Sequence, residues 1–187
     1  MTYRHSTPKN LTYQGVTLIE LMVTLALIAT FLAIATPGFS ALLRENQLNN
    51  QTTALTRALH YARSQALTLG QSVLICPLDN TLNCSTQNKK VWTQGWLVAV
   101  DQNNNRNFDL QNDVKLRIFQ NQKNNVQIMS NRTAVAVFSS NGNATGSNRT
   151  FKLCHKHDNK VSRKVVLSNS GRNRLIVPDK TTSSERC

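Results

Sequence analysis

The sequence of 187 residues is poor in aromatic residues, glycine, proline and acids. Aromatic residues make up 6% of the chain, so a hydrophobic core must rely mainly on Leu, Val, Ile and Ala. Seven glycines and four prolines are too few for a disordered tail that fills most of the length. Nine Asp and Glu against 22 Lys and Arg give a formal net charge of +13. The composition predicts about one folded, strongly basic domain beside any targeting segment.

The patterns on which enzymes depend are missing as well. The chain has no glycine-rich nucleotide loop, no pair of carboxylates in distinct settings, and no Ser/His/Asp arrangement. Its four histidines have no acid or nucleophile at a spacing that suggests catalysis. We therefore expect neither an enzyme nor a bound cofactor.

A single carboxylate stands in the long apolar run near the N-terminus. Glu20 follows Gly15 by five residues, and the run continues to Ala35. A lone charge in a membrane span is costly, which marks it as a functional residue. Together with Pro37, this pattern resembles the processing site of type IV prepilins. The resemblance implies that prepilin peptidase cleaves after Gly15 and methylates Val16, and that Glu20 pairs with the N-terminal amine of a neighbouring subunit.

This interpretation divides the chain into four segments. Residues 1–15 form a polar leader with two cations and no acid, as suits the cytoplasmic side of a membrane. Residues 16–36 are long enough to cross a bilayer, 37–70 form an amphipathic half of the same helix, and 71–187 form a globular head. A plain membrane anchor is the alternative, whereas an ordinary signal peptide would need a small-x-small cleavage site. We expect a single-pass protein of the bacterial inner membrane with a periplasmic head, which then joins other pilins in a filament.

Helical periodicity continues beyond the apolar run and ends near Gly70. One apolar stripe consists of Leu48, Leu55, Leu59, Ala62, Ala66 and Leu69. After Gly70, short apolar or alternating runs predict antiparallel strands separated by turns. These runs are residues 73–76, 91–100, 114–119, 126–129, 134–138, 151–153, 161–167 and 175–177. The predicted fold class is α+β, a long N-terminal helix whose stripe covers antiparallel β-sheets.

Five short motifs resemble, in their order and spacing, the FimT/GspH group of minor pilins and pseudopilins. They are residues 62–66 (ARSQA), 73–76 (VLIC), 92–96 (WTQGW) leading to Asp101, 138–142 (FSSNG) and 171–174 (GRNR). Each motif alone is weak, but together they cover nearly the whole chain. The resemblance implies the type IV pilin-like fold. Some FimT-like members serve DNA uptake in natural transformation, and a GRxR motif is associated with that role.

All four cysteines lie outside the apolar run. An even number in an exported domain predicts disulfides, and three connectivities are possible. Proximity in the sequence favours Cys76–Cys84 and Cys154–Cys187. A zinc site would need tighter pair spacing, so we expect no metal there.

A calcium loop is suggested by the alternation of Asp101, Asn103, Asn105 and Asn107. Arg106 occupies the place of the expected glycine, and Asn112 stands where a bidentate glutamate belongs. A solvated hairpin loop is the better interpretation.

The excess positive charge is confined to the C-terminal part of the chain. Residues 16–113 contain six Lys and Arg and six Asp and Glu, so their charges cancel. Residues 114–187 contain fourteen Lys and Arg against three Asp and Glu, a net charge of +11. Such a one-sided domain requires an anionic partner, for which DNA, anionic lipid headgroups and acidic cell-wall polymers are the candidates.

The candidate DNA-binding residues are concentrated between residues 149 and 174. They are Arg149, Lys152, Lys156, Lys160, Arg163, Lys164, Gly171, Arg172, Asn173 and Arg174. Gly171 allows a tight turn, and Arg172 and Arg174 point the same way if the segment is extended. Guanidinium groups bind phosphate bidentately, and Asn173 adds neutral hydrogen bonds.

Two functions remain open from the sequence. In the first, a minor type IV pilin binds DNA through its phosphate backbone, without strong sequence preference, during natural transformation. In the second, a structural pseudopilin of a type II secretion system or pilus tip contacts other pilins and not DNA. The sequence does not decide between double- and single-stranded DNA.

Overall fold

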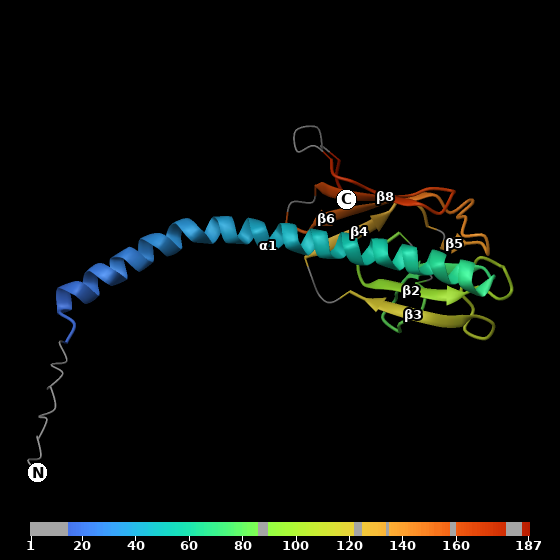
Figure 1. The fold of residues 1–187 in the computed structure, drawn as a ribbon, viewed down its shortest axis with the longest axis horizontal. Coiled ribbons are helices and arrows are strands. Elements are labelled where there is room, and N and C mark those ends of the chain that lie inside the picture. Colours follow the sequence, from blue (N-terminus) through green and yellow to red (C-terminus); the bar gives the residue numbers. More distant parts are fainter. Residues whose placement is uncertain (1–14, 86–89, 122–124, 134, 158–159, 179–184) are drawn as a thin grey trace, which may run out of the picture. The chain divides into compact units, whose positions relative to one another are not determined.

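The computed structural model describes residues 15–85, 90–121, 125–133, 135–157, 160–178 and 185–187 (Figure 1). The chain separates into two compact units, Met1–Leu42 and Leu43–Cys187. The helix α1 (Leu18–Leu69) contributes to both units. We describe each unit by itself.

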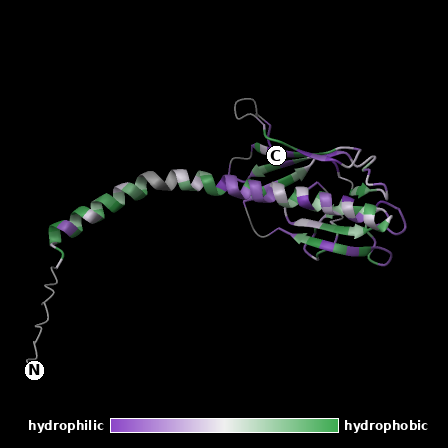
Figure 2. Cartoon of the chain, viewed as in Figure 1, coloured by the Kyte–Doolittle hydropathy of each residue, from purple (hydrophilic) through white to green (hydrophobic). Residues whose placement is uncertain are grey.

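Within the first unit, α1 is apolar on all sides. Its large side chains are exposed, from Leu18 at the start to Phe39 and Leu42 near the end, and Figure 2 shows hydrophobic colours over most of this part. By length and composition, no single helix among the described residues qualifies as a membrane span. Two consecutive helical pieces, Leu18–Ala33 and Gly38–Leu69, meet those criteria only as a broken pair.

Within the head, α1 becomes amphipathic and buries one stripe. The buried apolar residues of this half are Leu48, Leu55, Ala58, Leu59, Ala62 and Ala66. Leu69, predicted to belong to the stripe, is exposed because it is the last helical residue. Gly70 follows with a φ of 62°, the left-handed conformation that ends many helices and that glycine adopts without strain. The predicted stop at this residue is confirmed.

Among the described residues, eight strands form two antiparallel sheets of four strands each. The first sheet has the order β3-β2-β1-β5, and the second has the order β4-β6-β7-β8. The strands of the first are β1 (Val73–Pro77), β2 (Gly95–Val100), β3 (Val114–Gln120) and β5 (Ala136–Phe138). Those of the second are β4 (Val126–Ser130), β6 (Arg149–His155), β7 (Val161–Leu167) and β8 (Asn173–Ile176). The predicted α+β fold, a long helix on antiparallel sheets, is confirmed (Figure 1).

The main core joins α1 to both sheets. Its largest fully buried side chains include Trp92, Trp96, Phe138 and Phe151. The rings of Trp92 and Phe151 meet edge to face with centroids 4.8 Å apart, a favoured aromatic geometry. Both tryptophans and two of the six phenylalanines thus lie in the interior.

A second apolar cluster covers the other face of the first sheet. It consists of Leu74, Cys76, Leu78, Leu97, Ala99, Val135 and Val137, with Cys84 and Phe108 packed against it. As a result, every residue of β1 and β2 is buried. Strands buried on both faces have continuous apolar sequences, as VLICP and GWLVAV do.

The second strand is shorter than the sequence predicted. The apolar run from Val91 to Val100 was expected to be one strand, but β2 begins at Gly95. Trp92 donates its backbone N–H to the carbonyl of Ile128, and Val91 forms a bridge with Met129, so this end of the run joins the second sheet. Gly95 has a φ of 122°, and a Cβ there would lie 2.2 Å from the carbonyl oxygen of Phe119. This glycine therefore allows the chain to pass from one sheet to the other.

Each sheet has one disulfide. Cys76 at β1 is bonded to Cys84, and Cys154 at β6 is bonded to Cys187 at the end of the chain. This is the connectivity that proximity in the sequence favoured, and it is confirmed.

Candidate nucleic-acid interface

The predicted GRNR motif lies at the end of the turn between β7 and β8, and its last two residues begin β8. Gly171 donates its N–H to the carbonyl of Ser168 at 3.0 Å, and Ser168 donates its N–H to the carbonyl of Arg172 at 2.9 Å. Gly171 is buried, has a φ of 73°, and a Cβ there would lie 2.1 Å from the carbonyl oxygen of Gly142. Only glycine fits this turn, which packs against the turn at Gly142.

Arg172 and Arg174 flank an inward-facing residue. Asn173 is half-buried and donates its side-chain N–H to the carbonyl of Thr56 in α1 at 3.5 Å. The two arginines are exposed, and neither forms an ion pair with any residue that the structure describes. Asn173 positions β8 rather than facing solvent, so we leave it out of the interface proposed below.

Arg174 shares the outer face of the second sheet with two lysines. Register places Arg174 opposite Val166, Lys164 opposite Ile176, and Lys152 opposite Lys164. Because side chains alternate along a strand, Arg174, Lys164 and Lys152 lie on one face.

The C-terminal segment partly neutralises this face. The carboxylate of Glu185 forms ion pairs with Lys152 (Nζ to Oε1, 2.6 Å) and with Lys164 (Nζ to Oε2, 2.5 Å). The hydrogen bonds from Lys152 and Lys164 lower the pKa of Glu185 to about 2. Lys152 and Lys164, both predicted to contact DNA, are therefore already paired with a carboxylate.

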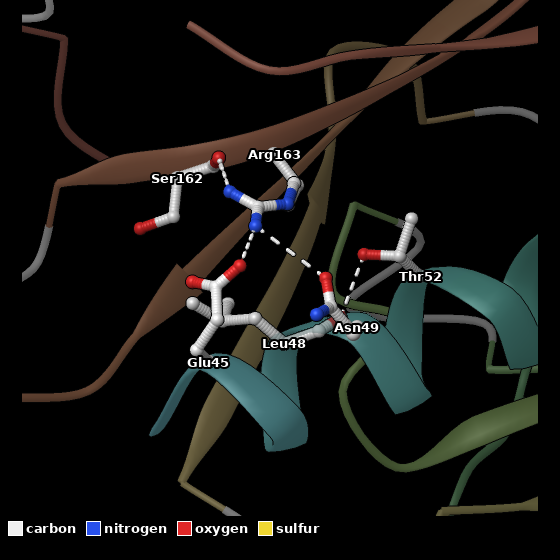
Figure 3. Close-up of polar contacts among 6 residues, drawn as sticks. All are labelled: Glu45, Leu48, Asn49, Thr52, Ser162 and Arg163. Carbon is white, nitrogen blue, oxygen red and sulfur yellow. Dashed lines mark hydrogen bonds and ion pairs between the residues drawn. The ribbon is translucent and has the colours of Figure 1, made fainter. Parts of the chain in front are cut away.

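Arg163 points to the opposite side of the sheet (Figure 3). Its Nη2 donates to the carboxylate of Glu45 and, at 3.4 Å, to the Asn49 side chain, both on α1. Its Nη1 donates to the carbonyl of Ser162 at 2.8 Å. These contacts tie β7 to α1, and we do not include Arg163 in the interface.

Arg149 is buried inside the head, with a relative exposure of 3%. Its Nε donates to the carbonyl of Ser147 at 3.0 Å, and its Nη2 donates to the carbonyl of Val135 at 2.7 Å. Burial, and then the positive charges of Arg132 and Arg106, lower the pKa of Arg149 to about 10. A guanidinium held in this way cannot reach a phosphate, so Arg149 supports the turn from beneath.

Lys156 and Lys160 are exposed at the connection between β6 and β7. Neither forms an ion pair with a described residue, and Lys160 pairs through its backbone with Arg186. The structure thus separates the ten predicted residues into an exposed set and a set that supports the fold. The exposed or half-exposed cations are Lys152, Lys156, Lys160, Lys164, Arg172 and Arg174.

Sequence reasoning missed one arginine near the turn. Arg63 of α1 is half-buried, and its Nε lies 3.3 Å from the position that a Cβ of Gly171 would take. This Nε is buried and has no hydrogen-bond partner among the described residues. Its place in the sequence, next to Ala62 of the apolar stripe, could have pointed to it. A helical residue at the edge of a buried stripe lies close to the border of the sheets that the stripe covers.

The loop between β2 and β3 is organised by its own side chains. The carboxylate of Asp101 accepts the backbone N–H groups of Asn105 at 3.1 Å and Arg106 at 3.0 Å. The carboxylate of Asp109 accepts the side-chain N–H groups of Asn103 and Asn105, and these bonds lower its pKa. No group of three or more His, Cys, Asp or Glu within the described ranges is placed to hold a metal ion.

The predicted processing site precedes α1. Gly15 and Val16 lie before the helix, which begins at Leu18. Glu20, in the first turn, donates its N–H to the hydroxyl of Thr17 at 3.3 Å, and its side chain is exposed.

Comparisons with known proteins point to one family. A sequence model of the family described as type II transport protein GspH matches residues 51–171. A second, described as the prokaryotic N-terminal methylation motif, matches residues 11–36. The chain matched no curated protein sequence.

Two crystal forms of the type IV minor pilin FimU from Pseudomonas aeruginosa strain PAO1 have a similar structure. The first is 18% identical, covers 76% of this chain and 96% of the FimU chain, and gives a TM-score of 0.54. The second is 20% identical, covers 73% and 98%, and gives a TM-score of 0.50. At such low identity, the similarity speaks for the fold alone.

Proposed function

The chain belongs to the GspH family of pilin-like structural proteins, and from that premise we propose that it is a minor type IV pilin whose head binds DNA. The N-terminal methylation motif makes it a substrate for prepilin processing and a component of a pilin assembly. The DNA-binding role, which would serve uptake in natural transformation, is our proposal for this member.

The observation that carries the proposal is the pair Arg172 and Arg174 beside a turn that only glycine can form. Both guanidinium groups are exposed and have no ion-pair partner among the described residues. Arg174 lies in β8 and Arg172 directly precedes this strand, on either side of Asn173, which is hydrogen-bonded to α1. Guanidinium groups bind phosphate in a bidentate manner, and a fixed pair of them suits successive phosphates of one strand.

The surrounding face extends the site. Lys164 and Lys152 lie on the same face as Arg174, and Lys156 and Lys160 lie at the end of β6 and β7. Trp92, Trp96, Phe138 and Phe151 are buried, so few rings of the head are available for base stacking. Binding should therefore act mainly through the phosphate backbone, weaken steeply with salt and show little sequence preference.

A direct test uses the full-length protein in an uncharged detergent and a labelled DNA duplex. R172Q/R174Q should abolish binding, because it removes both fixed guanidinium groups. K115Q/R117Q removes the same charge from β3, an edge strand of the other sheet, and should bind almost normally. R172K/R174K should bind weakly, since lysine keeps the charge without the bidentate geometry.

The alternative is a structural pseudopilin that contacts other pilins and not DNA. The family model's description as a type II transport protein favours this alternative. It predicts that the unmodified protein does not bind DNA near physiological salt. If K115Q/R117Q lost as much DNA affinity as R172Q/R174Q, binding would depend on the net charge of the head and not on the assigned site.

We also propose that the N-terminus is cleaved after Gly15 and that Glu20 pairs with the new amine of Val16 on a neighbouring subunit. A buried ion pair is tolerated in a membrane-like filament core better than either charge alone. Glu20→Ala should be processed at a normal rate but enter filaments poorly. Normal assembly of this variant would remove Glu20 from that role.

A further inference from the structure

Two exposed arginines from distant parts of the chain meet at the turn before β6. The Nη2 of Arg106 donates to the carbonyl of Thr145 at 3.2 Å and to the hydroxyl of Ser147 at 2.9 Å. The Nη1 of Arg132 donates to the carbonyl of Gly146 at 3.2 Å. Three successive residues of one turn therefore hold two guanidinium groups close together.

Within the described ranges, the fold keeps these two like charges together without a carboxylate paired to either guanidinium group. Neither Arg106 nor Arg132 forms an ion pair with a residue that the structure describes. Asp101 contacts Arg106 only at its backbone N–H. Arg149 lies beneath the same turn, and the charges of Arg132 and Arg106 contribute to its lowered pKa. Such repulsion is relieved when an anion binds.

Arg106 has a left-handed backbone conformation, from which its side chain reaches the turn at residues 145–147. Its φ of 62° lies in the left-handed region, which is strained for a residue with a side chain. The hydrogen bond from its N–H to Asp101 helps to hold that conformation. Glycine or asparagine would fit the backbone with less strain, so the guanidinium group is what distinguishes arginine at this position.

This cluster adjoins the GRNR turn. Ala144 donates its N–H to the carbonyl of Asn169 at 2.8 Å, and Gly146 donates its N–H to the Asn169 side chain at 3.3 Å. Gly171 packs against Gly142 at the other end of the same loop. The turn that holds Arg106 and Arg132 is therefore bonded directly to the loop that carries Arg172.

We propose that Arg106 and Arg132 form a second phosphate-binding position, which continues the DNA-binding surface of Arg172 and Arg174 across this junction. This inference rests on the proposed function and adds a place where the backbone of the same nucleic acid is held. Each guanidinium has five N–H donors, and the contacts to the turn leave several of them for phosphate oxygens. The turn fixes the two groups before DNA arrives, which reduces the ordering that binding requires.

The test compares salt dependence among four forms of the full-length protein in uncharged detergent. These are the unmodified chain, R106Q/R132Q, R172Q/R174Q and the charge-matched control K115Q/R117Q. Each lost phosphate contact removes about 0.9 from the slope of log affinity against log salt. For R106Q/R132Q we therefore expect the slope to fall by about 2, and the affinity loss between roughly 50 and 200 mM salt to shrink about tenfold.

The outcomes separate this inference from the proposed function. If R172Q/R174Q loses binding while R106Q/R132Q matches K115Q/R117Q in affinity and slope, the second position is wrong and the DNA-binding function stands. If the unmodified protein does not bind the duplex, both are wrong. Loss of affinity in R106Q/R132Q for vesicles of anionic lipid, with DNA binding intact, would also contradict the second position.

A measurement on the unmodified chain guards against a variant that misfolds. Isotope-labelled protein in detergent micelles is titrated with a short duplex, and the backbone amide and arginine Nε–H signals are followed. Signals of Arg106, Arg132 and residues 145–147 should shift together with those of Arg172 and Arg174. Shifts confined to residues 168–174 would overturn the inference.

Discussion

Both sheets of the head contribute to the core beneath α1, and among the described residues an apolar cluster also covers the other face of β1, β2 and β5 in the first sheet. Loops and an apolar cluster bury all of β1 and β2. In the second sheet, β6 and β7 contain both buried and half-buried residues, and β8 has no fully buried residue. The open face holds Lys152, Lys164 and Arg174.

This difference explains how one small domain combines stability with binding. In the first sheet, β1, β2 and β5 are buried on both faces, so they supply burial without offering a polar surface, whereas the edge strand β3 is largely exposed. One face of the second sheet packs on α1 and the core. The other face contacts the C-terminal segment at Glu185 and Cys187 but leaves its lysines half-exposed, so it can hold like charges at small cost in stability. Binding residues on such a face stand on rigid strands, which favours a fixed geometry.

The largest difference between the sheets should appear when a lysine is placed on the face of each sheet that points away from α1. Leu97 of β2 lies in the covered cluster with an exposure of 0%, and Val166 of β7 is half-buried on the open face. L97K buries an unpaired charge and should cost roughly 5 kcal/mol of unfolding free energy, whereas V166K should cost less than about 1. Urea denaturation of both variants measures this, and similar losses would show that the two faces are not covered differently.

The two disulfides should also contribute unequally. They close segments of 8 and 33 residues, Cys76–Cys84 in the first sheet and Cys154–Cys187 in the second. The loop-entropy relation gives about 2.5 kcal/mol for the shorter loop and about 3.7 for the longer one. C154S/C187S should therefore lower the urea midpoint more than C76S/C84S. The reverse order would show that burial of Cys76 in the covered cluster outweighs loop entropy.

A substitution at Gly171 should lower both the unfolding free energy and the affinity for DNA. G171A places a methyl group at a φ of 73° and against the carbonyl oxygen of Gly142. We expect a loss of about 2–3 kcal/mol and a weaker hold on DNA, because the turn must separate from its neighbour. Gly70 has a φ of 62° but an open surrounding, so G70A is the matched control and should cost only about 1–2 kcal/mol. Equal losses in thermal unfolding would show that the contact with Gly142 contributes nothing.

Much of this architecture could be predicted from the sequence, because local patterns determine it. Residues close together in the sequence are enough to predict three features: the stripe from Leu48 to Ala66, the stop at Gly70 and the short strand-forming runs. The start of β2 could not be predicted, since Val91 and Trp92 continue the apolar run while pairing with the other sheet. An apolar run does not tell which sheet its ends will join.

The candidate site was predicted in composition but not in arrangement. Spacing identified Arg172 and Arg174, and the structure exposes both. It could not separate them from Arg163, which faces α1, or from Arg149, which is buried, because the sequence does not show which face of each strand packs on the core. Arg106 and Arg132 meet through a turn near residue 146, a contact that no local pattern contains.

The smallest effect should come from Glu185, which lies between Lys152 and Lys164 on the open face. Its lowered pKa means that the pairs stabilise the fold above the ordinary pKa of 4.5 and lose this effect as the pH falls toward about 2. E185Q should cost less than about 1 kcal/mol at neutral pH, as exposed ion pairs do. Denaturation of both proteins at decreasing pH should show the difference vanish in that acid range, and a constant difference would contradict the linkage.

The same substitution should strengthen DNA binding, because it frees two lysines on the face that Arg174 shares. Glu45→Gln is the matched control: it also removes one negative charge, but it frees Arg163, which faces α1. If the open face is the binding face, E185Q should raise affinity severalfold and steepen the salt dependence by up to about 2 in slope, while E45Q should change both far less. Equal gains in the two variants would mean that DNA responds to the total charge of the head, and the distinction between the open sheet and the rest of the surface would no longer account for binding.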